Sequence, residues 1–172
     1  MNCETIALRD PRSGTSAQIL PGLGFNCYQF RTSEAFRQLD VLWSEPDFEL
    51  GTKRASGSGI PLLFPFPGRI ADATLDWNGK QIELEDGDGL GNALHGFVHE
   101  RPWRVLQVEA TRAVGQFQAS VDDPKILDSW PADFRITATY EVAENRLSTT
   151  IVLENTGAHH SPCCFGTHPC FR

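Results

Sequence analysis

Residues 134–155 contain the pattern that most restricts what this chain can fold into. Between positions 134 and 142, apolar and polar residues alternate strictly. The apolar positions are Phe134, Ile136, Ala138, Tyr140 and Val142. A period of two is typical of a β-strand that buries one face. The polar stretch AENR follows, and then LSTTIVLEN, which is rich in β-branched residues. We therefore predict an antiparallel hairpin over this region.

The rest of the chain favours the same fold class. Helical periodicity is nearly absent, and turn signals such as Asn78-Gly79 separate several short strand candidates. These candidates are DVLWSE (40–45), QIELED (81–86), RVLQVEA (104–110) and GQFQASV (115–121). Many short strands separated by Gly and Pro predict an all-β fold, an antiparallel sandwich or barrel. With 172 residues, of which 40% are hydrophobic, the chain is long enough for one good core, so we expect a single domain over 1–172.

Charge and cysteine usage exclude several classes of partner. The net charge of -7 argues against binding to nucleic acid, which needs clustered Lys and Arg. The first residues, MNCETIALRDPRSG, have no apolar signal region, and nowhere do enough apolar residues run together to span a bilayer. Five cysteines is an odd number, and no Asn-x-Ser/Thr sequon is present. We expect reduced thiols in a cytoplasmic protein that binds neither nucleic acid nor membrane.

One long segment, residues 51–77, combines Gly and three prolines with apolar residues. Loops are normally polar, and long apolar ones tend to be packed over a functional site. The prolines exclude a central strand, because proline lacks the backbone N–H that a ladder needs. The segment is either the wall of a binding cleft that includes Arg69, or a rigid loop that runs over the protein surface and leaves the arginine exposed.

Two other motifs predict no ligand site. GDGLGN (87–92) lacks the G-x-G-x-x-G spacing and no helix start follows it, so we interpret it as a tight acidic turn. Potential zinc ligands gather near the end of the chain: His159, His160, Cys163, Cys164, His168 and Cys170. Adjacent cysteines point to opposite sides of a strand, and no C-x-x-C spacing is present, so we predict no metal. The pair His159-His160 is expected in an exposed turn.

Three residues remain as candidates for chemistry: Arg69 in PGRI, His95 in ALHGFV and His168 in GTHPCF. Both histidines have Gly and apolar or aromatic neighbours, which would partly desolvate the imidazole and bring its pKa near neutrality. Each is alternatively a structural histidine that is hydrogen-bonded to a neighbour. Signatures of a Ser, Thr or Cys nucleophile are missing.

Several sequence blocks resemble, in order, those of the aldose 1-epimerases, a family of galactose mutarotase-like proteins. The blocks are GSGIPLLFPFPGRI (57–70), WNGK (77–80), NALHGFVHERPW (92–103), the hairpin sequence 134–155 and FGTHPCF (165–171). In the last block, Cys170 stands where tyrosine is common in the family. The resemblance runs from about residue 39 to the last residue. It implies a large antiparallel β-sandwich, called a supersandwich, that binds a hexose in a cleft.

The resemblance also implies roles for the three candidates. Arg69 matches an arginine that contacts sugar hydroxyls, His95 matches a histidine that binds the sugar near its ring oxygen, and His168 matches the general acid that protonates this oxygen. The family's general base, a glutamate, and a sugar-binding aspartate both come after the G-x-H-P block. The chain therefore resembles the N-terminal part of a longer epimerase domain, truncated at the C-terminus within the active site and without its base.

The implied reaction interconverts the α and β anomers of an aldohexose. A base takes the O1 proton while an acid gives one to O5, so we expect no metal and no organic cofactor. A hexose-6-phosphate 1-epimerase is the nearest rival, and in it an arginine such as Arg101 would reach the phosphate. The same residues are also compatible with a non-catalytic carbohydrate-binding protein or with a structural β-domain. The sequence predicts neither the particular sugar nor the oligomeric state.

Overall fold

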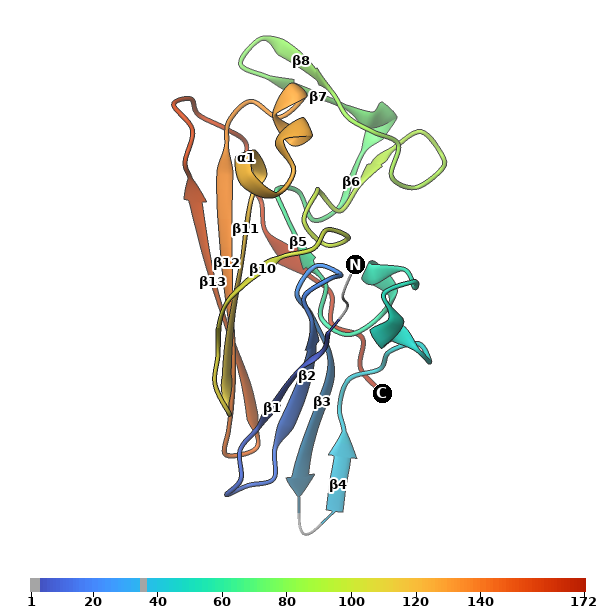
Figure 1. Ribbon diagram of the computed structural model, residues 1–172. Helices are drawn as coiled ribbons and strands as arrows, with labels where there is room; N and C mark the ends of the chain where they lie inside the picture. The colour runs from blue at the N-terminus through green and yellow to red at the C-terminus, as the bar shows by residue number, and fades with distance from the viewer. Residues whose placement is uncertain (1–3, 35–36) are drawn as a thin grey trace.

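A computed structural model describes residues 4–34 and 37–172, and of Glu34 only the backbone. Two four-stranded antiparallel sheets, each with its strands in chain order, dominate the structure (Figure 1). The first sheet contains β1 (Ile6–Arg9), β2 (Ser16–Leu20), β3 (Asn26–Glu34) and β4 (Arg37–Asp40). The second contains β10 (Arg104–Val108), β11 (Arg112–Gln118), β12 (Phe134–Ala143) and β13 (Arg146–Asn155). Cys3 lies outside the described residues.

The predicted hairpin is confirmed as β12 and β13. Their register pairs Phe134 with Asn155 at one end and Ala143 with Arg146 at the other. Along β12 the predicted apolar positions are buried, while the polar positions are intermediate or exposed. The connecting residues, Glu144 and Asn145, have φ values of 49° and 64°. A two-residue turn with both central residues in the left-handed region matches the twist of the flanking strands.

The shorter strand predictions met different outcomes. Strand β10 lies within 104–110, and the Asn78-Gly79 turn joins β7 (Thr74–Trp77) to β8 (Lys80–Glu83) as expected. The 115–121 prediction extends too far, because β11 ends at Gln118 and a helical turn, α1 (Ala119–Asp122), follows. There the Asp122 carboxylate accepts a hydrogen bond from the backbone N–H of Gln118 at 2.7 Å.

The strand predicted over 40–45 is wrong. Strand β4 ends at Asp40, and only Leu42 forms a bridge, to Phe171. The backbone of this stretch is bonded to the end of the chain instead, since Trp43 N–H donates to the Cys170 carbonyl and Arg172 N–H donates to the Val41 carbonyl. The remaining elements are short two-residue strands and 3₁₀-helices. They are η1 (Phe48–Leu50), η2 (Ala55–Gly57), β5 (Leu62–Leu63), β6 (Arg69–Ile70), η3 (Ala71–Ala73), β9 (Ala93–Leu94), η4 (Pro124–Asp128) and β14 (Gly166–Thr167).

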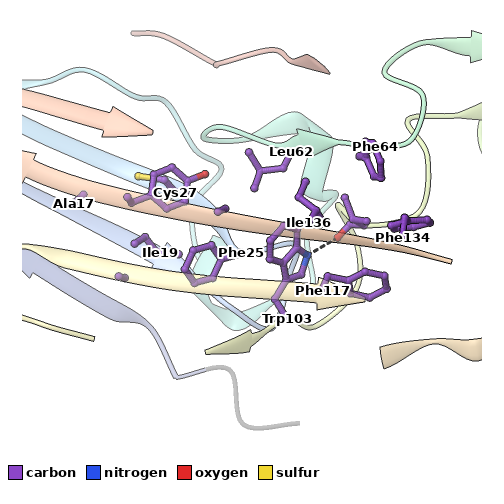
Figure 2. Packing of buried hydrophobic residues seen from close by; sticks show 14 of the residues in the cluster. Ala17, Ile19, Phe25, Cys27, Leu62, Phe64, Trp103, Phe117, Phe134 and Ile136 are labelled. Carbon is purple, nitrogen blue, oxygen red and sulfur yellow. Dashed lines mark hydrogen bonds between the residues drawn. The ribbon is translucent and has the colours of Figure 1, made fainter. Parts of the chain in front are cut away.

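The main core lies between the two sheets, and Figure 2 shows part of it. The Phe25 ring stacks on Trp103 at 5.8 Å and on Tyr140 at 5.6 Å between ring centroids. A Cβ at Gly115 would lie 2.6 Å from the Phe25 ring, so only glycine fits at this point of β11. The Trp103 indole N–H is satisfied by the Val98 carbonyl at 3.0 Å. This packing of one sheet face on another is the predicted all-β antiparallel sandwich.

A polar cluster ties the turns of the two sheets together at one end of the sandwich. Asp10 is buried and accepts hydrogen bonds from the Ser13 hydroxyl at 2.6 Å and from the Glu144 backbone N–H at 3.2 Å. Thr15 Oγ1 accepts a third, from Asn145 N–H. Because β1–β2 and β12–β13 belong to different sheets, these bonds fix one sheet relative to the other.

Candidate functional site

The proline-rich segment 61–70 is the element that brings the candidate residues together. Its β5 pairs with β14, with Leu63 opposite Gly166 and Leu62 opposite Thr167. The Thr167 hydroxyl also donates to the Pro61 carbonyl at 2.6 Å, and Cys164 N–H donates to the Pro65 carbonyl at 2.8 Å. The chain just before His168 is therefore fixed against this segment.

The same segment also pairs with the block that carries His95. Phe97 N–H donates to the Phe64 carbonyl at 2.8 Å, and His95 N–H donates to the Gly68 carbonyl at 3.1 Å. Strands β6 and β9 continue this pairing. As a result, the rings of His95 and His168, which are far apart in the sequence, lie 5.1 Å apart between centroids at an interplanar angle of 52°.

Two glycines allow this close packing. A Cβ at Gly166 would lie 2.4 Å from the Cβ of Pro67, and a Cβ at Gly96 would lie 2.1 Å from the Phe64 carbonyl oxygen. Both distances are far inside van der Waals contact. Gly96 also has a φ of 72°, where a side chain is strained. The glycine positions in G-x-H-P and L-H-G are thus explained by backbone approach to the 61–70 segment.

His95 is held rigidly by its surroundings. Its backbone has a φ of 65°, which is uncommon for a residue with a side chain and is often found at functional sites. Its Nδ1 lies 2.8 Å from the Pro67 carbonyl oxygen, which can only accept, so this contact fits an imidazole with the proton on Nδ1. Burial lowers the pKa of His95, although the Pro67 hydrogen bond opposes this shift. The ring is therefore neutral at pH 7, with the lone pair of Nε2 free to accept a hydrogen bond.

His168 differs from His95 in its exposure. It is exposed, whereas His95 is half-buried. Pro169 follows it, which disfavours the α region and favours an extended backbone for His168. An imidazole on a fixed backbone can present its nitrogen atoms to a ligand at a constant place.

Arg69 lies at the end of the 61–70 segment, in strand β6, which pairs with strand β9 just before His95. Its backbone pairs with Leu94, the residue before His95. Its side chain is 61% exposed, and its Nε donates to Asp88 Oδ2 at 2.8 Å. Residues 61–65 are buried while Arg69 is exposed, and the cleft wall that includes Arg69 stays a prediction. The predicted acidic turn is confirmed, with the Asp86 carboxylate accepting three backbone N–H bonds within it.

A third histidine, His99, was not among the sequence candidates for this cluster. Its ring lies 5.7 Å from that of His95 in an edge-to-face arrangement, and its side chain is buried. Its Nε2 is 3.5 Å from Glu100 Oε1, and this imidazole is the main cause of the lowered pKa of Glu100. The only sequence signal for it was its place in the same block as His95. His99 also lines a cavity of about 230 Å³ together with Arg54, Ser56, Glu100 and Arg101.

A much larger open groove, of about 1070 Å³, lies between the β7–β8 hairpin and the η4 region. Its lining includes Trp77, Lys80, Asp123 and His160, but none of Arg69, His95 and His168. Size alone therefore does not locate the site. We place the candidate site at the His95–His168 pair, where backbone pairing with the 61–70 segment brings two histidine rings together.

Metal ligands do not gather in the described part of the chain. Within residues 4–34 and 37–172, no group of three or more His, Cys, Asp or Glu side chains is arranged to hold a metal ion. Cys163 and Cys164 are exposed, and so are His159 and His160, as predicted for their turn. In these same ranges no helix has the length and apolarity needed to cross a membrane.

Comparison with known proteins gives one family and one fold. A family model described as aldose 1-epimerase matches residues 4–172. Among solved structures, the chain is similar to the Slr1438 protein from Synechocystis, with 23% identity and a TM-score of 0.79 over 99% of this chain and 55% of that one. It is similar to a GalM/aldose epimerase homologue from C. elegans, with 20% identity and a TM-score of 0.77 over 98% and 50% of the two chains.

A galactose mutarotase-like protein from Clostridium acetobutylicum gives 21% identity and a TM-score of 0.76, over 92% of this chain and 48% of that one. At these identities the similarity establishes the fold, and the expected galactose mutarotase-like sandwich is confirmed. The chain spans about half the length of the solved structures that it matches.

Proposed function

The chain belongs to the aldose 1-epimerase family, and from this premise we propose that it supplies part of the active site of an enzyme that interconverts the α and β anomers of an aldohexose. The observation that carries the proposal is the juxtaposition of His95 and His168. The proline-rich segment 61–70 pairs with the backbone next to each of them and so holds the two rings side by side. Residues placed by backbone pairing can hold a sugar in one orientation, which acid–base catalysis requires.

Anomer exchange needs the cyclic hemiacetal to open and close. A base removes the O1 proton while an acid gives a proton to the ring oxygen O5, and C1 then turns about the C1–C2 bond before the ring closes. We assign the acid to His168, which the pairing of β14 with β5 holds beside His95. The base, by family resemblance a glutamate, is proposed to lie outside these 172 residues.

His95 suits a binding role beside the ring oxygen. Because its Nδ1 proton is directed at the Pro67 carbonyl, the side chain presents Nε2 as an acceptor for a sugar hydroxyl. Its lowered pKa keeps it neutral, so it does not compete with His168 as a proton donor. Arg69, at the end of the same wall, is proposed to donate to a further hydroxyl.

The charges near the site favour an unphosphorylated sugar. The cavity beside His99 is lined by two cations, Arg54 and Arg101, and by three carboxylates, which are Glu85, Asp86 and Glu100. Arg101 is already engaged, since its Nε contacts Asp123 Oδ2 and its Nη1 donates to the Phe97 carbonyl. A phosphate would therefore meet a lining with more carboxylates than cations and an arginine whose charge is already paired with Asp123.

Polarimetry on freshly dissolved α-D-galactose and α-D-glucose tests the proposal with the intact protein. We expect the approach to anomeric equilibrium to be faster than in buffer alone, and glucose 6-phosphate to react more slowly than glucose. Binding of the sugars without acceleration would instead favour a non-catalytic carbohydrate-binding protein, and the reverse order of glucose and its phosphate would favour a hexose-6-phosphate 1-epimerase.

A further inference from the structure

We propose that Asp88 is a positioning residue that orients the Arg69 guanidinium for sugar binding, an inference that rests on the proposed function. The acidic turn 87–92, in which Asp88 lies, takes no part in the reaction outlined above. Two carboxylates organise this turn: Asp86 accepts three backbone N–H bonds, and Asp88 accepts two more and also contacts Arg69.

Asp88 is almost completely enclosed, with a side chain that is only 3% exposed. Its Oδ2 accepts from Arg69 Nε at 2.8 Å and from Asn92 Nδ2 at 3.0 Å. Its Oδ1 accepts from the backbone N–H of Leu90 at 2.9 Å and of Asn92 at 3.2 Å. The Asn92 amide and then Arg69 hold the pKa of Asp88 well below its usual range, so the carboxylate is charged at any working pH.

The turn that carries Asp88 is itself fixed to the histidine block. Gly87 N–H donates to the Asn92 carbonyl at 2.8 Å. A Cβ at Gly87 would lie 2.8 Å from the Leu94 backbone nitrogen, so the turn packs directly on β9. Strand β9 leads into His95 and pairs with Arg69. Asp88 is thus held in a fixed position relative to Arg69 and His95.

This contact settles the orientation of an otherwise mobile side chain. Arg69 is 61% exposed, and a free arginine would lose rotamer freedom each time it closed on a ligand. Bonding Nε to Asp88 removes that cost in advance and leaves the N–H donors of the two terminal nitrogens for sugar hydroxyls.

The experiment is a double-mutant cycle on the affinity for D-galactose, measured by titration calorimetry on the intact protein. Asp88→Asn should weaken binding about three- to tenfold, as expected when a preset orientation is lost. In the Arg69→Ala background, the same substitution should have no further effect, because Asp88 acts through Arg69. Asp76→Asn, which removes an exposed carboxylate from β7, is the matched control and should bind as the wild type does.

Kinetics provide a second readout that a purely structural role would not reproduce. Asp88→Asn should raise KM and leave kcat near the wild-type value, since Arg69 binds substrate and transition state alike. If Asp88→Asn does not fold, Asp88→Glu retains the charge at a displaced position and should show the same selective rise in KM.

Additive effects of the two substitutions, or unchanged affinity in Asp88→Asn, would overturn the positioning role. An Arg69→Ala variant that binds like the wild type would overturn it as well. Failure of the proposed function looks different, because the wild-type protein would then not accelerate mutarotation at all.

Discussion

Gly166→Ala is the substitution that tests most sharply how the fold positions His168. The added Cβ would lie 2.4 Å from the Cβ of Pro67, whereas carbon atoms in contact are about 3.5–4.0 Å apart. Pro67 cannot turn aside as a flexible side chain would, because its ring is part of the backbone. Strand β14 must therefore move by about 1 Å away from the segment that it pairs with.

This displacement should affect catalysis far more than stability. A shift of about 1 Å in a catalytic group can cost about 100-fold in rate, so kcat for mutarotation should fall by about that factor. Overpacking of this kind costs about 1–3 kcal/mol in the free energy of unfolding, and β14 contributes only two paired residues. Both quantities can be measured on one sample, by polarimetry and by thermal unfolding.

Gly57→Ala is the matched control. A Cβ at Gly57 would meet only the Glu45 Oε1 atom, at 3.7 Å, which is ordinary contact. This variant should keep wild-type kcat. If Gly166→Ala also keeps kcat within about twofold of wild type, then a displacement of this size does not misplace the acid and the positioning argument is refuted.

Two further predictions concern pH and metals. Hydrogen bonding, above all from Ser13, lowers the pKa of Asp10 to about 2, so its contribution to stability is complete above the ordinary carboxyl pKa of about 4 and is lost as pH falls from there towards 2. The free energy of unfolding of the wild type should therefore approach that of Asp10→Asn as the pH falls through this window. A difference between the two proteins that stays constant over the window would contradict this prediction. Dialysis against a chelator should leave mutarotation unchanged, because proton transfer between oxygen and nitrogen atoms needs no Lewis acid; activity that is lost and then restored by zinc would refute this.

Local pattern was sufficient to predict the elements whose partners are close in sequence. The β12–β13 hairpin follows from strict alternation and a polar turn, and its strand faces agree with the pattern. The Asn78-Gly79 turn likewise joins two strands that pair with each other. In these cases the pairing partner and the turn residues are contained in one short stretch.

The failed strand over 40–45 shows the opposite situation. Its backbone bonds to residues 170–172, near the end of the chain, and no local pattern reveals a partner at that distance. The same limit explains why the contact of Arg69 with Asp88 was not predicted. The acidic turn could be recognised from its composition, but the residue that its carboxylate binds could not.

Convergence of the site residues depends on the 61–70 segment pairing on both sides. Composition identified this segment as apolar and proline-rich, but which parts of the chain would lie against it was not visible in the sequence. Only the family resemblance linked His95 with His168, and it did not include His99, whose packing on His95 requires the folded chain.

The central claim, that His168 is the general acid, is tested most directly by His168→Asn in the intact protein. Asparagine keeps a hydrogen-bond donor of similar size but cannot cycle a proton. The account predicts that kcat for mutarotation falls by about 10²–10⁴-fold while the melting temperature stays close to that of wild type. Turnover within a few-fold of wild type would contradict the account and would make His95 the better candidate.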